Sequence, residues 1–194
     1  MVLAQADITL EHREILLKDR PEELLKISSK GTVPVLHIDD NNIIDESLDI
    51  MIWGIQHSQL DFLKENSQKQ LDMIKMNDNN FKYWLDRYKY FDRFPELRYI
   101  DYQNKCKEYM SVYDKSLTDN IYFMGDFIQC VDIAIFPFIR QCANVDFKWF
   151  QEEFINLNTW LQKIVSSKLF LSTMKKYEVW NQIDKGHTVN YNNA

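Results

Sequence analysis

The stretch that decides the fold is Lys30-Gly31-Thr32-Val33-Pro34-Val35-Leu36, which Asp45-Glu46-Ser47-Leu48-Asp49-Ile50 follows after a short gap. A proline among strand residues removes a ladder hydrogen-bond donor, so it belongs at the start or the edge of a strand. The second stretch places an acid and a hydroxyl where a helix begins. A strand edge beside an open helix start is one way of holding a small peptide-like ligand.

The residues around these two stretches have the pattern of a small α/β unit. Apolar and polar residues alternate from Ile8 towards Leu17, which predicts a strand. Pro21 and the two acids after it predict a helix start, since proline suits the first turn and acids suit the positive end of the helix dipole. Further along, the pattern predicts a strand over 33–38, a turn over 39–42, a strand at 43–44 and a helix over 46–57.

The rest of the chain is helical by its apolar and aromatic spacing. We expect helices over 66–94, 99–117, 132–142, 149–164 and 168–177, the first interruptible at 77–80 and the third bent at Pro137. The fold class is therefore α/β plus all-α. The expected organisation is an α/β domain over 1–57, an α-helical domain over 64–180 and a polar, mobile tail over 181–194.

Composition argues against several classes of function. The 194 residues carry a net charge of −6, which argues against nucleic acid and anionic membrane surfaces as partners. No apolar run approaches the ~18 residues that span a bilayer. The N-terminus lacks the basic region and apolar run of a signal peptide. We expect a cytoplasmic protein that binds neither membrane nor nucleic acid.

The three cysteines, Cys106, Cys130 and Cys142, are widely spaced, and the four histidines lack metal-ligand spacing. A disulfide framework and a metal site are therefore not expected. Buried, reduced thiols are the simpler interpretation. Cys130 precedes a predicted helix, where a reactive thiolate is the alternative.

Each half of the deciding stretch has two interpretations. A cis peptide bond at Pro34 turns the N–H and C=O of Val33 away from the sheet and towards a peptide-like ligand, whereas a trans bond simply opens a strand. Glu46 and Ser47 can hold the ammonium and carboxylate of an amino acid, or they are ordinary helix caps.

Gly31-Thr32-Val33-Pro34-Val35-Leu36 with Asp45-Glu46-Ser47 resembles the glutathione site of the glutathione transferase superfamily. The segment 123–126 with 131–141 resembles the central helix of that family's C-terminal domain, and 81–90 resembles a bacterial branch. The resemblance implies a thioredoxin-like N-terminal domain, a helical-bundle C-terminal domain and a homodimer. It also implies glutathione as co-substrate, with a small electrophilic or disulfide second substrate.

The resemblance also implies roles for four residues. The backbone of Val33, before Pro34, would pair with the cysteinyl part of glutathione, and Glu46 and Ser47 would hold its γ-glutamyl end. Arg20 lies where related sequences carry a base for the glycyl carboxylate; a solvated surface charge is the alternative for it.

The start of the chain departs from the family pattern. Met1-Val2-Leu3-Ala4 matches the middle of the family's first helix, so we expect that the first strand and the catalytic turn are missing and that no residue is catalytic. Activity would be impaired, and the N-terminal domain would be distorted, less stable or completed by a partner. A non-enzymatic interaction domain on the same scaffold is the alternative, and a misassigned start codon or an incomplete clone would also explain the departure.

The central helix shows a second departure from the family pattern. Gln129 stands where the family has serine or threonine as helix cap, three residues before Asp132. Glutamine is the poorer cap, although Asp132 can still reach back to a backbone N–H.

Overall fold

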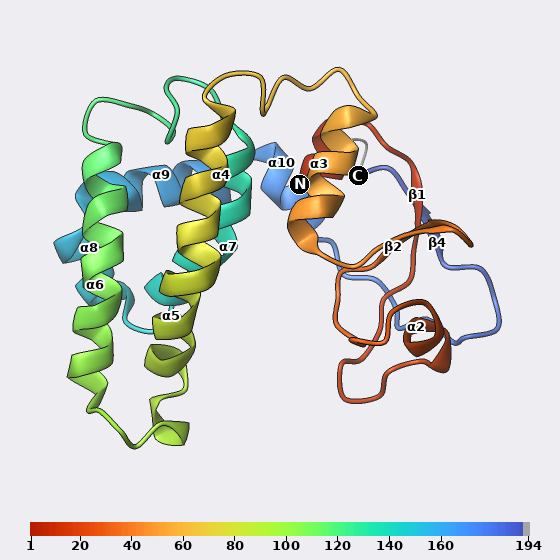
Figure 1. Ribbon diagram of the computed structural model, residues 1–194, viewed down its shortest axis with the longest axis horizontal. Coiled ribbons are helices and arrows are strands. Elements are labelled where there is room, and N and C mark those ends of the chain that lie inside the picture. The colour runs from red at the N-terminus through yellow and green to blue at the C-terminus, as the bar shows by residue number, and fades with distance from the viewer. Residues whose placement is uncertain (192–194) are drawn as a thin grey trace. The chain divides into compact units, whose positions relative to one another are not determined.

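The computed structural model describes residues 1–191 and divides them into two compact units (Figure 1). The N-terminal unit comprises 1–60 together with the C-terminal segment from 168 on, and the helical unit comprises 61–167. Residues 168–180 were expected to belong to the helical domain, whereas they group with the N-terminal unit. Residues 192–194 of the predicted tail lie outside the described residues.

The N-terminal unit is built from short elements. In chain order they are α1 (Val2–Gln5), β1 (Leu10–His12), α2 (Glu22–Ile27), β2 (Leu36–Asp39), β3 (Asn42–Ile44), α3 (Ser47–Gln56), α10 (Lys168–Thr173) and β4 (His187–Val189). The strands form two separate antiparallel pairs, β1 with β4 and β2 with β3. The prediction of an α/β unit is confirmed, but the strand expected over 8–17 is only three residues long.

Helix α3 is packed closely against α1 at Gly54. A Cβ atom at this glycine would lie 2.8 Å from Cδ2 of Leu3 and 3.4 Å from Cγ1 of Val2. Val2, Ala4 and Ile50 are buried at this contact between the helices. The contact fixes α3, whose first residues are the predicted binding residues.

The C-terminal segment supplies a strand to the N-terminal unit. Leu10 pairs with Val189 and His12 with His187, in antiparallel register (Figure 1). The Val189 side chain is buried, and the Tyr191 hydroxyl hydrogen-bonds to Nδ1 of His12. The prediction of a mobile tail is therefore wrong for these residues, because they satisfy backbone groups of β1 that otherwise need water or another chain.

The helical unit consists of α4 (Ser67–Met76), α5 (Lys82–Lys89), α6 (Tyr99–Ser116), α7 (Cys130–Ala143), α8 (Phe147–Glu153) and α9 (Ile155–Val165), with a π-helical turn (Asn77–Phe81) and a 3₁₀ turn (Phe91–Arg93). The π turn lies at the predicted interruption of the first long helix. Pro137 lies inside the continuous helix α7. The helix expected over 149–164 is instead two helices, which meet at Phe154. Among the described residues, no helix has the length and apolarity that crossing a membrane requires.

A buried carboxylate organises the helical unit. Asp132, in the first turn of α7, accepts hydrogen bonds from the backbone N–H of Phe123 (3.0 Å) and of Gln129 (2.9 Å). Its Oδ1 also accepts from Nε1 of Trp160 on α9, at 2.8 Å. Burial outweighs these donors and raises the Asp132 pKa to about 6. The prediction that Asp132 reaches back to a backbone N–H is confirmed, while Oε1 of Gln129 is buried without a partner.

Replacing this glutamine should stabilise the protein. Gln129→Ser removes the unpartnered Oε1 and supplies a short hydroxyl cap, which is worth about 1 kcal/mol. In a chain of this size that difference raises the Tm by roughly 2–4 °C in a thermal unfolding scan. Gln129→Ala is the control without a cap; a Tm for Gln129→Ser no higher than that of Gln129→Ala would contradict the capping account.

The β1–β4 pairing should protect the N-terminal unit from proteolysis. Val189→Asp places a charge in the buried side of β4 and should release the strand, because an unpaired buried charge is strongly destabilising. Limited proteolysis should then show early cleavage within residues 1–30. Thr188→Asp, at the exposed neighbouring position, is the matched control. Equal cleavage rates in the two variants would show that β4 does not support the unit.

Candidate functional site

The segment before the Val-Pro step is tied to the start of α3 by polar side chains. Oγ of Ser28 donates to Oδ2 of Asp45 at 2.7 Å. Nζ of Lys30 donates to Oδ1 of Asp45 at 3.0 Å and to Oε1 of Glu46 at 2.5 Å. These bonds hold the loop that carries Val33 beside the N-terminus of α3.

The same contacts set the protonation of the charged groups. Hydrogen bonds from Ser28 and then from Lys30 hold the Asp45 pKa below its ordinary value. Hydrogen bonds to Glu46 and then to Asp45 raise the Lys30 pKa. The Asp45 carboxylate is therefore ionised and the Lys30 ammonium is charged at neutral pH.

The N-terminus of α3 offers free hydrogen-bond donors. Glu46 is the N-cap residue, and no side chain caps the helix. The N–H of Ile50 is the first to bond back, to the carbonyl of Glu46 at 3.0 Å. The amides from Ser47 to Asp49 and the exposed Ser47 hydroxyl therefore face outwards, at the positive end of the helix dipole.

The peptide bond between Val33 and Pro34 is cis, which decides between the two interpretations of Pro34. The Val33 residue is 47% exposed. Strand β2 begins only at Leu36, and within residues 1–191 the N–H and C=O of Val33 make no hydrogen bond. This backbone unit is free to pair with a ligand.

Arg20 lies next to the same loop. Gly31 has a φ of +58°, and a Cβ atom there would lie 3.4 Å from Cδ of Arg20 and 3.8 Å from its Nη1. The guanidinium forms no ion pair with a carboxylate in the described part of the chain. An exposed cation thus lies beside Gly31 of this loop.

The structure thus places Arg20, the Val33–Pro34 step and the Glu46–Ser47 pair around one loop. Ser28 and Lys30 were not predicted as site residues, because Lys30 was considered only as part of the stretch around Pro34 and Ser28 was given no role in binding. The residue types could have predicted these contacts, because a hydroxyl and an ammonium precede the Val-Pro step and two carboxylates precede the helix.

No reactive thiol belongs to this site. Cys106, Cys130 and Cys142 are all buried in the helical unit. Burial, and secondarily Asp132, raises the pKa of Cys130 to about 12, so the alternative of a reactive thiolate is wrong. Across residues 1–191, no group of His, Cys, Asp and Glu side chains is arranged to hold a metal ion.

Comparison with known proteins identifies the family. A model of the glutathione S-transferase N-terminal domain matches residues 1–57, and a model of the C-terminal domain matches residues 98–168. The chain belongs to the glutathione S-transferase superfamily. No curated protein sequence matches it significantly.

Solved glutathione transferases share the fold. One from Pseudomonas fluorescens, with two glutathione molecules bound, is 20% identical with a TM-score of 0.71, over 86% of this chain and 82% of its own. One from Phanerochaete chrysosporium, in complex with oxidized glutathione, is 16% identical with a TM-score of 0.74, over 88% and 85%. These likenesses confirm a thioredoxin-like domain and a helical domain of the transferase fold.

The hydrogen bond from Ser28 predicts a pH effect. Ser28→Ala should raise the Asp45 pKa towards its ordinary value, as measured by carboxyl NMR against pH. A carboxyl whose pKa is lower in the folded protein than in the unfolded chain stabilises the fold at pH values above its unfolded-state pKa. That stabilisation is lost as the pH falls through the folded-state pKa. The destabilisation by Ser28→Ala should therefore be smaller in acid than at neutral pH.

Asp39 provides the internal control for this titration, because its pKa is lowered by Asn42 and Asn41 and not by Ser28. Its pKa should stay unchanged in the variant. An unchanged Asp45 pKa would instead show that Ser28 does not hold this carboxylate.

Proposed function

We propose that the N-terminal unit binds glutathione along the loop from Arg20 past Val33 to Glu46 and Ser47. The observation that carries this proposal is the bridge from Ser28 and Lys30 to the start of α3, which holds a free backbone step beside open helix donors. Glutathione is an extended tripeptide with a carboxylate at each end and an ammonium at one end. The site offers a cation, a free backbone step, a carboxylate and open helix donors, which are complementary to these groups.

The γ-glutamyl end of glutathione is matched by the start of α3. Its carboxylate accepts hydrogen bonds from the Ser47 hydroxyl and from the free amides, helped by the helix dipole. Its ammonium donates a hydrogen bond to the Glu46 carboxylate. Oε1 of Glu46 already accepts a hydrogen bond from Lys30, so Oε2 is the oxygen that accepts from the ligand. Lys30 thus orients the Glu46 carboxylate without occupying all of it.

The middle and the glycyl end are matched by the loop. The cysteinyl part of glutathione pairs its backbone with the N–H and C=O of Val33 as an added strand, packing beside Pro34. The glycyl carboxylate pairs with the Arg20 guanidinium.

The reaction we propose is conjugation of glutathione, in which the thiol loses its proton and its sulfur bonds to a small electrophile as the leaving group departs, or exchange with a small disulfide, which releases one thiol. It is slow, because the thiol must lose its proton and the N-terminal unit contains no cysteine to assist by forming a mixed disulfide. A homodimer remains a prediction from the family resemblance, and a cytoplasmic location remains a prediction from the sequence.

A non-enzymatic interaction domain is the second candidate, favoured by the burial of all three thiols in the helical unit. The conjugation rate of glutathione with 1-chloro-2,4-dinitrobenzene separates the two candidates. A rate above the uncatalysed one that falls in Glu46→Ala supports the transferase. A rate equal to the uncatalysed one supports the interaction domain.

Glutathione binding should depend on the Glu46 carboxylate. In isothermal titration calorimetry, Glu46→Ala should weaken binding at least about tenfold, because a hydrogen bond to a charged group is worth ~1.5–3 kcal/mol. Glu46→Gln should weaken it less, since the amide oxygen still accepts. Asp40→Ala removes a fully exposed carboxylate of the hairpin turn and should bind like the wild type. Equal binding heats for the wild type and Glu46→Ala would remove the proposed site.

A further inference from the structure

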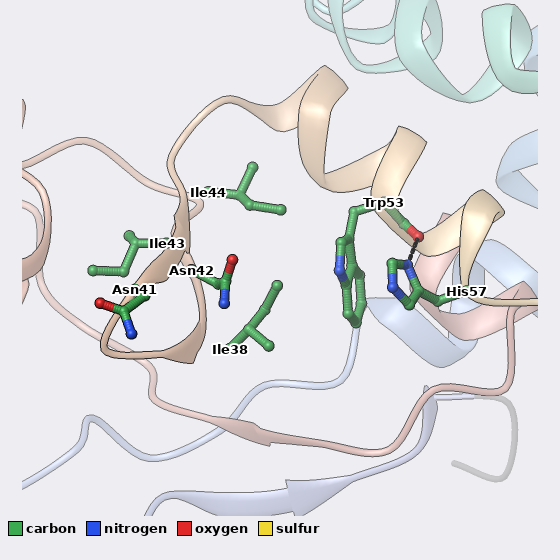
Figure 2. Close-up of a pocket in the computed structure, with 7 residues that line it drawn as sticks. All are labelled: Ile38, Asn41, Asn42, Ile43, Ile44, Trp53 and His57. Carbon is green, nitrogen blue, oxygen red and sulfur yellow. Dashed lines mark hydrogen bonds between the residues drawn. The ribbon is translucent and has the colours of Figure 1, made fainter.

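Two cavities of the N-terminal unit differ in the charge of their lining. One lies between the β2–β3 hairpin and the last turns of α3, where Figure 2 shows Trp53 between Ile38 and His57. Its lining contains no lysine, arginine or acid, so it offers no ion pair to a charged ligand. The other cavity, of about 590 Å³, lies at strand β4 and is lined in part by charged side chains. Its volume is within the range of ligand sites.

The cavity at β4 runs between two segments of the chain. One wall consists of Lys175, Lys176, Tyr177 and Glu178, and the other consists of His187, Thr188, Val189 and Asn190. Successive side chains of a strand point to opposite faces of a sheet. A cavity that is lined by consecutive residues of a strand therefore runs along the edge of that strand and not over one of its faces.

This edge of β4 has no partner strand. Along its other edge, β4 pairs with β1 in the register that sets His187 opposite His12 (Figure 1). Within residues 1–191 these two strands form a sheet of their own, so no further strand pairs with β4. An open edge presents backbone N–H and C=O groups, and an extended peptide can satisfy them by adding a strand.

The wall opposite β4 is fixed by ring contacts and by the backbone. The centroid of the Tyr177 ring lies 4.7 Å from that of His12 and 5.2 Å from that of His187. Three residues further on, the backbone N–H of Trp180 donates to the carbonyl oxygen of Glu14 at 2.8 Å. Both walls are thus anchored to β1 and to the residues after it, so the cavity is formed before a ligand enters it.

The lining carries an excess of positive charge, although the net charge of the chain is −6. It contains the exposed side chains of Lys175 and Lys176, with Glu178 as its one acid. In the part of the chain that the structure describes, neither ammonium forms an ion pair, and Nζ of Lys175 lies 5.7 Å from the centroid of the Tyr177 ring. Two unpaired ammonium groups beside an open strand edge favour an acidic ligand.

We propose that this cavity binds an extended peptide segment with acidic side chains, which adds a strand to the open edge of β4. Backbone hydrogen bonds to β4 supply affinity that does not depend on the sequence of the segment. Aspartate or glutamate side chains of the segment pair with Lys175 and Lys176 and supply selectivity. None of the residues proposed to hold glutathione lines this cavity, so the site does not depend on the function proposed above.

The probe is the peptide acetyl-TEVETE-amide, with two matched peptides. In acetyl-TKVKTK-amide the charges are reversed, and N-methylation of the four central amides of the probe removes donors on both of its edges. In ¹H–¹⁵N NMR titrations of the full chain, the probe should shift the amides of residues 175–178 and 187–190 most strongly. It should bind at least about tenfold more tightly than either matched peptide. Raising NaCl from about 50 to about 300 mM should weaken its binding, because exposed charges are screened.

Reversing the charge of the two lysines tests the cationic wall. A variant with both Lys175→Glu and Lys176→Glu should bind the probe at least about tenfold more weakly, because two attractions become repulsions. Both positions are exposed, so the variant keeps the fold. Lys18→Glu changes another exposed lysine of the N-terminal unit, outside this cavity, and should bind like the wild type. Saturating glutathione should leave the Kd of the probe unchanged.

Several results would overturn the proposal. These are shifts centred outside residues 175–178 and 187–190, wild-type affinity in the double lysine variant, and displacement of the probe by glutathione. Equal affinity for the N-methylated peptide would show that no strand is added to β4. Free glutarate that shifts the same amides with the same Kd as the probe would show that the cavity binds a small anion and not a peptide.

Discussion

The Lys30 ammonium makes the interaction on which the candidate site depends. It bonds to Asp45 and to Glu46, which stand directly before α3, while the loop it belongs to carries the free backbone of Val33. An exposed ion pair contributes little to stability, so its value lies in geometry. It holds the loop with the open backbone step next to an oriented carboxylate and an open helix start.

The rest of the N-terminal unit supports this geometry from both ends of the chain. Helix α1 packs on Gly54 and fixes α3, and the C-terminal strand β4 pairs with β1. The four strands of the unit form two separate pairs and not one continuous sheet, and the unit buries few side chains. The helical unit is organised differently, around the buried Asp132 carboxylate that joins α7 to Trp160 of α9.

The sequence predicted those features that depend on local chemistry. The start of α3 at Glu46–Ser47, the hairpin after Pro34 and the cap by Asp132 all follow from residue types within a few positions. Long-range pairings were missed. The Ser28 and Lys30 bonds cross 15–17 positions, and Gly186 bonds to Glu11 over 175 positions. The three residues of β4 stand in a polar segment, so no periodicity indicated a strand. The cis bond at Pro34 was left open, because a tripeptide favours neither isomer decisively.

The central claim is that one tripeptide contacts both the loop and the helix start. The most direct measurement is a ¹H–¹⁵N NMR titration with reduced glutathione that follows backbone amides of the N-terminal unit. The account predicts that the amides of Val33 and Ser47 shift together, with one common Kd. Shifts at only one of these two amides, or none at either under saturating glutathione, would contradict it.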